Sequence, residues 1–157
     1  MTDQMDEAGA RAVATTVGAL YHSVHDLMRE QVRDLDRGTL NWKPLPLANS
    51  IAVLIVHTLA AERDAIRAVR LLTTERDREA EFKAEAEGAD LLALLDKADR
   101  ELNELVGGMT AADLTEMRPR PPRDPKPGLE WLLSNYGHAR EHLAQIELTK
   151  QLYDSRT

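Results

Sequence analysis

The sequence predicts an all-α fold, a four-helix bundle whose helices are joined by long connections. Four segments repeat apolar residues every three or four positions, as the buried face of a helix requires. Alanine, leucine, glutamate and arginine are abundant while aromatic residues make up 4%, a composition that favours helices over sheets. No stretch alternates apolar and polar residues as a half-buried strand does. Four such helices bury their apolar faces most simply against one another.

The first two helices are expected at residues 6–35 and 51–72. Gly38 supplies a stop after the first, and the connection RGTLNWKPLPLANS contains two prolines that prevent the helix from continuing. Asn49 or Ser50 is a good N-cap for the second helix. The following segment, TTERDREAEFKAEAEG, is charged on nearly every side except at Phe82. We expect it to carry the chain across the bundle.

The third and fourth helices are expected to start at Asp90 and near Leu129. Asp90 is the predicted cap of the third helix, and Gly107 and Gly108 end it. The sequence TAADL that follows is typical of a short capped turn of helix. Residues 118–128, RPRPPRDPKPG, contain five prolines and are expected to lack regular structure. The fourth helix should then run to about Tyr153.

Composition excludes several classes of protein. The chain has 157 residues, which we expect to form one domain over residues 1–157. Its net charge of −7 argues against a general nucleic-acid binder, and the lack of cysteine excludes disulfides and thiolate metal sites. The first ten residues lack the pattern of a signal peptide, and the longest apolar run, residues 51–56, is too short to cross a membrane. We therefore expect a cytoplasmic protein with no membrane partner.

The five histidines differ in their expected surroundings. His22 and His25 are predicted to lie on a solvated flank of the first helix, with metal binding through their three-residue spacing as the alternative. His57 lies at the border of the second helix's buried stripe. His138 and His142 are four residues apart, about 40° around the helix, so their rings can bind one cation. A third imidazole from a neighbouring helix would complete a facial set with open positions for water or substrate. The spacing alone is also compatible with surface or packing histidines.

The segments LNWKPLPLANSIAVLIVHTLAAERD and WLLSNYGHAREHLAQIELTKQLYD together resemble the DinB-like superfamily of metal-binding four-helix bundles, which includes the YfiT-type proteins. The resemblance covers nearly the whole chain. It is carried by Trp42 and the prolines after it, the start of the second helix at Asn49, one mid-helix histidine, and the C-terminal pattern H-x-x-x-H-x-x-Q-I.

This resemblance implies that His57, His138 and His142 bind one divalent metal ion, with nickel, zinc, iron or manganese as candidates. Three neutral nitrogen donors suit several of these ions, so the donor set does not select one. A metal-ligating histidine normally donates its other N–H to an acceptor. Glu62, Glu141 and Gln145 are candidates for that role.

The resemblance also implies two alternative functions. The first is an enzyme, either a metal-dependent hydrolase or a transferase that uses a low-molecular-weight thiol as cosubstrate. No catalytic residue is identified for it. Ser50 and Ser134 are candidate nucleophiles, but Ser50 is better explained as the start of a helix. The second is a non-catalytic metal-binding or stress-associated bundle. A third interpretation makes the three histidines packing residues only.

Two further features bear on partners. Family members commonly pair, and Val53, Val56 and Leu59 lie away from the main buried stripe of the second helix, so we expect a homodimer. The alternative is that the charged segment after this helix covers them. A basic run is predicted to be a solvated linker, and the alternative is that it binds an acidic ligand or a phosphate; its residues are Arg118, Arg120, Arg123 and Lys126.

The two tryptophans, Trp42 and Trp131, are predicted to pack in the core. The alternative is that they line a ligand pocket.

Overall fold

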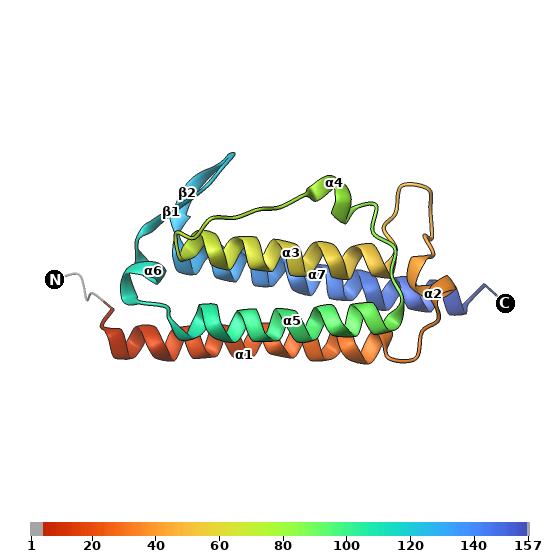
Figure 1. Cartoon of the computed structure of the whole chain (residues 1–157), viewed down its shortest axis with the longest axis horizontal. Helices are drawn as coiled ribbons and strands as arrows, with labels where there is room; N and C mark the ends of the chain where they lie inside the picture. Colours follow the sequence, from red (N-terminus) through yellow and green to blue (C-terminus); the bar gives the residue numbers. More distant parts are fainter. Residues whose placement is uncertain (1–4, 157) are drawn as a thin grey trace.

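The computed structural model describes residues 5–156 and contains four long helices side by side (Figure 1). The long helices are α1 (Glu7–Val32), α3 (Ile51–Val69), α5 (Gly88–Gly107) and α7 (Gly128–Asp154). The connections contain the short helices α2 (Arg37–Asn41), α4 (Arg78–Glu81) and α6 (Ala111–Thr115), and the strands β1 (Met117–Arg120) and β2 (Arg123–Pro127). The predicted helical bundle is confirmed.

Each long helix packs against two others. Helix α3 contacts α5 and α7, and α1 contacts the same two helices. Helices α3 and α5 run in the same direction, opposite to α1 and α7, so residues 70–87 must return along the length of the bundle (Figure 1). This return is the crossing predicted from the charged segment. It places α4 against α3.

Short polar side chains start the helices, largely where the sequence indicates. The Asp6 and Ser50 side chains accept from the amides of Gly9 and Val53, at 2.7 and 3.2 Å. Helix α5 starts earlier than predicted, because Glu87 occupies the N-cap and Asp90 accepts from the Glu87 amide in a capping box. The predicted capped turn TAADL is helix α6.

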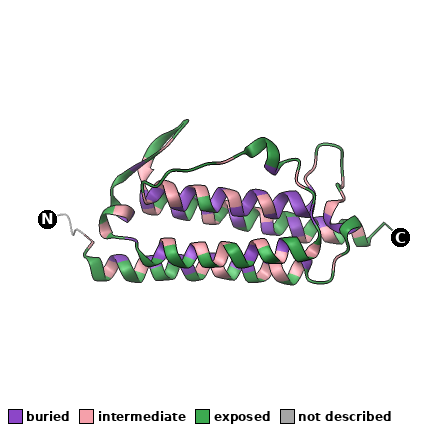
Figure 2. Ribbon diagram, viewed as in Figure 1, coloured by how far each residue is buried: buried purple, intermediate pink, exposed green. Residues whose placement is uncertain are grey.

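The buried residues lie on the faces of the long helices that are turned toward one another (Figure 2). Their apolar side chains form two clusters. One cluster, nearer the start of α3, includes Ile55, Leu95 and Ile146. The other surrounds Tyr21 and Trp131 near the start of α7. Trp131 therefore packs in the core as predicted, although it also lines the cavity described below, and its indole N–H donates to the carbonyl of Arg118 at 2.9 Å. Trp42, by contrast, is only half-buried and lies against Tyr153, with 5.5 Å between the ring centroids. Burial of these side chains drives the association of the helices.

The expectation that residues 118–128 lack regular structure is wrong. Strands β1 and β2 pair in an antiparallel ribbon in which Arg118 lies opposite Lys126. A two-stranded ribbon consists only of edge strands, where proline is tolerated at positions whose N–H would face outward. Proline content therefore excludes a central strand but not this hairpin. Within the described residues, no helix is long and apolar enough to cross a membrane.

Gly128 fixes the start of α7 and provides a stability test. Its amide donates to the carbonyl of Glu116 at 3.1 Å, and a Cβ at this position would lie 1.8 Å from the carbonyl oxygen of Asp113. Gly128→Ala should therefore lower the free energy of unfolding by at least about 1–3 kcal/mol, because backbone must move. Gly137→Ala in the same helix meets no atom within 4 Å and should raise it by about 1 kcal/mol. Urea denaturation measures both, and equal stability of the two variants would contradict this account.

Candidate metal centre

Three histidines from α3 and α7 converge on one point. Each of His57, His138 and His142 offers one ring nitrogen, and these three atoms all lie within 4.8 Å of one another. The Nε2 atoms of His57 and His138 are 3.2 Å apart. The His138 and His142 ring centroids are 4.2 Å apart, one helical turn from each other on α7. The structure thus brings together the three residues that the sequence singled out, while metal binding by them stays a prediction.

The crossing segment orients His57. Its Nδ1–H donates to Oε2 of Glu81 at 2.9 Å, and Glu81 is held in turn by Arg76, with the closer contact 2.7 Å. Both partners are nearly inaccessible, with side-chain exposures of 7% for His57 and 6% for Glu81. The Phe82 ring lies 4.8 Å from the His57 ring. With the proton fixed on Nδ1, the lone pair of Nε2 points toward the other two histidines.

His142 shows the same division of roles between its two nitrogens. Its Nδ1 donates to Oε1 of Gln145 at 2.9 Å. Its Nε2 is buried and has no hydrogen-bond partner among the described residues. Leaving a buried polar atom unsatisfied costs about 1–3 kcal/mol. A cation bound by this lone pair would remove that cost.

The surroundings keep two of the rings uncharged at neutral pH. Burial lowers the pKa of His138 to about 4, and the nearby His142, His57 and Arg76 add to the effect. Burial also lowers the pKa of His57, and this outweighs the opposing effect of the hydrogen bond that the ring donates to Glu81. Neutral imidazole is the form that binds metal. These rings therefore need not lose a proton before they bind a cation at pH 7.

The geometry fits a small divalent ion. Nitrogen ligands at about 2.0–2.1 Å from a tetrahedral ion lie about 3.3 Å from one another. The Nε2 atoms of His57 and His138 are already 3.2 Å apart, and the orphaned Nε2 of His142 completes the set. Three ligands leave at least one coordination position for water or another molecule.

A cavity of about 550 Å³ opens beside His57 and His138, and cations line it. Arg78 and Arg123 lie 5.8 and 6.0 Å from the ring centres of Phe82 and Trp131, and neither has an ion-pair partner among the described residues. Arg120, by contrast, pairs with Asp64. The remaining lining residues are His57, Ala61, Arg76, Asp124, Lys126, Trp131, Ser134, Asn135, Gly137, His138 and Glu141. On a chain of net charge −7, this cavity is locally basic.

The basic run is therefore not a solvated linker as predicted. Arg118 is 5% exposed and donates to the carbonyl of Val69 at 2.8 Å, while Arg120, Arg123 and Lys126 line the cavity. The hairpin supplies these three cations because β1 and β2 lead directly into α7.

The three candidate partners of the histidines lie in different places. Gln145 contacts His142 as expected, Glu141 lines the cavity, and Glu62 contacts His25 instead. Sequence reasoning missed Glu81, although it singled out the adjacent Phe82 as the apolar residue of its segment. Ser50 caps α3, as expected from its position, whereas Ser134 lines the cavity.

The expectation of a solvated flank is wrong for His25, whereas His22 is partly exposed. His25 is fully buried, and its two nitrogens lie 2.7 Å from Asp99 and 2.8 Å from Glu62. Helix α1 is covered by α5 on this side, so the rotation of His25 away from the Val24 stripe does not bring it to solvent.

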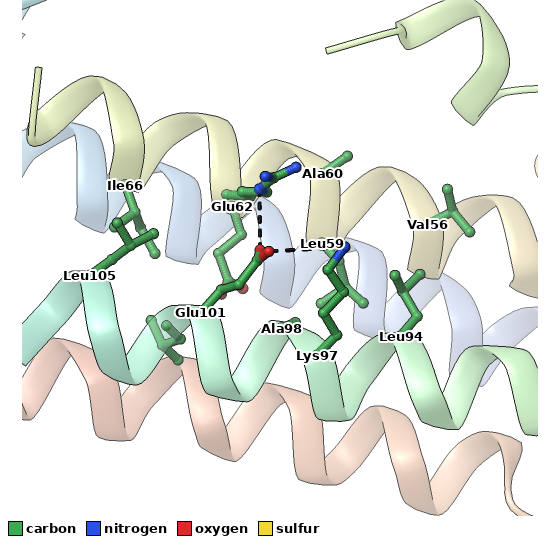
Figure 3. Close-up of a pocket in the computed structure, with 12 residues that line it drawn as sticks. Val56, Leu59, Ala60, Glu62, Ile66, Leu94, Lys97, Ala98, Glu101 and Leu105 are labelled. Carbon is green, nitrogen blue, oxygen red and sulfur yellow. Dashed lines mark ion pairs between the residues drawn. The ribbon is translucent and has the colours of Figure 1, made fainter. Parts of the chain in front are cut away.

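A second, smaller cavity of about 160 Å³ lies between α3 and α5 and is mainly apolar (Figure 3). Val56 and Leu59 line it, and an ion pair between Arg63 and Glu101 links the two helices. Val53 and Leu59 are 1% and 5% exposed within the single chain. The apolar side on which the homodimer prediction relied is therefore mostly covered without a second copy.

Comparisons with known proteins agree with this architecture. The model of the DinB superfamily matches residues 20–146. Similar solved structures include a conserved protein from Enterococcus faecalis, with 17% identity and a TM-score of 0.75 over 90% of this chain and 97% of that one. A DinB-like protein from Bacillus subtilis has 14% identity and a TM-score of 0.69 over 90% of this chain and 94% of that one. A DinB-like protein from Bacillus cereus has 15% identity and a TM-score of 0.69 over 83% of this chain and 86% of that one. No curated protein matches the chain.

The contact between Glu81 and His57 can be tested apart from the ligands themselves. Glu81→Gln should weaken zinc binding about 10–100-fold, because the uncharged amide no longer favours the orientation and basicity of His57. Glu79→Gln is the matched control, since Glu79 lies on the same short helix but pairs with Lys83. Competition with a chromophoric chelator measures both affinities. Equal losses in the two variants would show that Glu81 does not act through His57.

Proposed function

The chain belongs to the DinB superfamily, and from this we propose that His57, His138 and His142 hold one divalent metal ion at which a small anionic molecule reacts. The observation that carries the proposal is the convergence of three ring nitrogens beside a basic cavity. Nickel, zinc, iron and manganese remain candidates, because neutral nitrogen donors suit all four.

The residues around the proposed metal have different roles. Glu81 and Gln145 hold the rings of His57 and His142 so that the Nε2 lone pairs converge. Arg78 and Arg123 offer positive charge that no carboxylate of the described chain neutralises, and Trp131 supplies an apolar wall. Anionic groups on a substrate would form ion pairs with these two arginines. A metal bound at the three histidines would polarise a carbonyl or lower the pKa of a water or thiol.

Two reactions are compatible with this site, and they differ in the second reactant. In a hydrolase the second reactant is water; in an S-transferase it is a low-molecular-weight thiol, and anionic groups on that thiol or on its acceptor would suit the same arginines. Turnover of small esters and of electrophilic carboxylates, each with and without added thiol, separates the two. The alternative is a non-catalytic metal-binding bundle that is associated with stress. Under this alternative, neither assay should show turnover.

We also propose a cytoplasmic protein of one domain over residues 1–157 that forms a homodimer. The dimer rests on the resemblance to the family, since the apolar side of α3 is mostly covered. Light scattering at micromolar concentration tests it, and a mass of 17.6 kDa that does not change on concentration would contradict it.

The double variant His138→Ala, His142→Ala should lose the metal that copurifies with the untagged protein while keeping its helical circular dichroism. Both side chains are only partly buried, so their truncation should open little core volume. Elemental analysis beside far-ultraviolet circular dichroism measures the two effects. Unfolding of the metal-free variant would favour the packing interpretation of these histidines.

The double variant Arg78→Gln, Arg123→Gln should raise the KM for an anionic substrate about 10-fold or more, equivalent to ~1.4 kcal/mol, with zinc affinity unchanged. Arg37→Gln is the control, because Arg37 pairs with Glu85 and Glu87 and does not line the cavity. The increase should shrink at high salt as the charges are screened. An unchanged KM would show that the substrate's charge is not recognised there.

A further inference from the structure

A second cluster of polar side chains lies between α1, α3 and α5 and does not use the three histidines above. His22 and His25 are one turn apart on α1 and both face α5. The Nδ1 atoms of His22 and His25 approach the same oxygen, Oδ1 of Asp99, at 2.8 and 2.7 Å. The ligand atoms of the three residues all lie within 4.8 Å of one another.

The outer nitrogens of both rings are also held. Nε2 of His22 lies 2.8 Å from Oδ1 of Asn103, and Nε2 of His25 lies 2.8 Å from Oε2 of Glu62. In metal sites the ring nitrogen that does not bind the ion normally donates to such an acceptor. With the protons on both Nε2 atoms, two Nδ1 lone pairs and one carboxylate oxygen are directed at each other. That arrangement is stabilised by positive charge at its centre.

Two protons or one divalent ion can supply that charge. Protons would make both neighbouring rings imidazolium ions that share one carboxylate. Burial lowers the pKa of His25, but Glu62 and Asp99 outweigh this effect and raise it. The same carboxylates attract a metal ion, so the ion and the protons compete for one place.

The surroundings provide both support and access. Arg29 pairs with the other oxygen of Asp99 and so leaves Oδ1 directed at the two rings. His25 has no exposed surface, whereas the side chains of His22 and Asp99 are 33% and 21% exposed. An ion can enter on that side, and water can complete its coordination. Ligand atoms around zinc lie about 3.3 Å apart, so each Nδ1 would recede from Asp99 by about half an ångström.

We propose that His22, His25 and Asp99 form a second site for a divalent transition-metal ion, with zinc as the probe, bound through two Nδ1 atoms and one carboxylate oxygen. The ion links α1 to α5 and, through the hydrogen bond between His25 and Glu62, to α3. Figure 3 shows Glu62, one of the residues that line the apolar cavity, extending from α3 toward α5. The site therefore ties three of the four long helices together, independently of any reaction at the first site.

Counting zinc ions on untagged protein by equilibrium dialysis tests the proposal. The wild-type chain should bind two ions and the variant His138→Ala, His142→Ala one. Adding Asp99→Asn to that variant should leave none. Asp96→Asn is the matched control, because Asp96 also pairs with Arg29 but contacts neither histidine, and the count should stay at one. Zinc should also raise the Tm of the double-histidine variant, and Asp99→Asn should abolish this shift.

An absence of zinc on the folded double-histidine variant at tens of micromolar would overturn the second site. So would a count that Asp99→Asn does not reduce. If the double-histidine variant fails to fold, Asp99→Asn in the otherwise wild-type chain should lower the count from two to one, and an unchanged count overturns the proposal. If the three histidines of the first site bind no metal, the wild-type chain would also bind one ion. That ion would then still be bound after replacement of His138 and His142, which distinguishes this outcome from failure of the second site.

Discussion

The candidate site depends on the contact between α3 and α7. The two helices must lie close enough for His57 to meet His138 and His142, and the rings must face one another without protonated nitrogens between them. Burial lowers the pKa of His57 and His138, so these rings stay uncharged at neutral pH. In the chain alone, His57 and His138 share a hydrogen bond between their Nε2 atoms, and Nε2 of His142 has no partner among the described residues. A cation bound by all three Nε2 atoms would give each of them a partner.

The connections outside the bundle supply the carboxylate that orients His57 and three of the cations that line the cavity. Residues 70–87 return along α3 because α3 and α5 run in the same direction, and this return places Glu81 on His57. The hairpin between α6 and α7 contributes Arg120, Arg123 and Lys126 to the cavity. The bundle thus provides the ring nitrogens, while two of its connections provide orientation and charge. A related bundle with different connections could keep the histidines and bind a different molecule.

Sequence predicted the helices and the convergence of the three histidines, because apolar periodicity fixes which faces meet and the resemblance supplied the pairing of His57 with the other two. It missed Glu81, since nothing in a charged segment indicates which carboxylate will be buried. It also misplaced His25, because the angle around α1 does not reveal that α5 covers that flank. The hairpin was missed because five prolines exclude a central strand but not a ribbon with two outer edges. Each miss concerns a contact between distant segments.

Anomalous diffraction from crystals of the untagged protein, recorded on both sides of the absorption edge of the metal it contains, tests the central claim most directly. The account predicts an anomalous peak at about 2.0–2.2 Å from Nε2 of His57, His138 and His142, with Glu81 still bound to Nδ1 of His57. Absence of a peak between these rings after growth in zinc, with His57 and His138 joined only by their hydrogen bond, would contradict it.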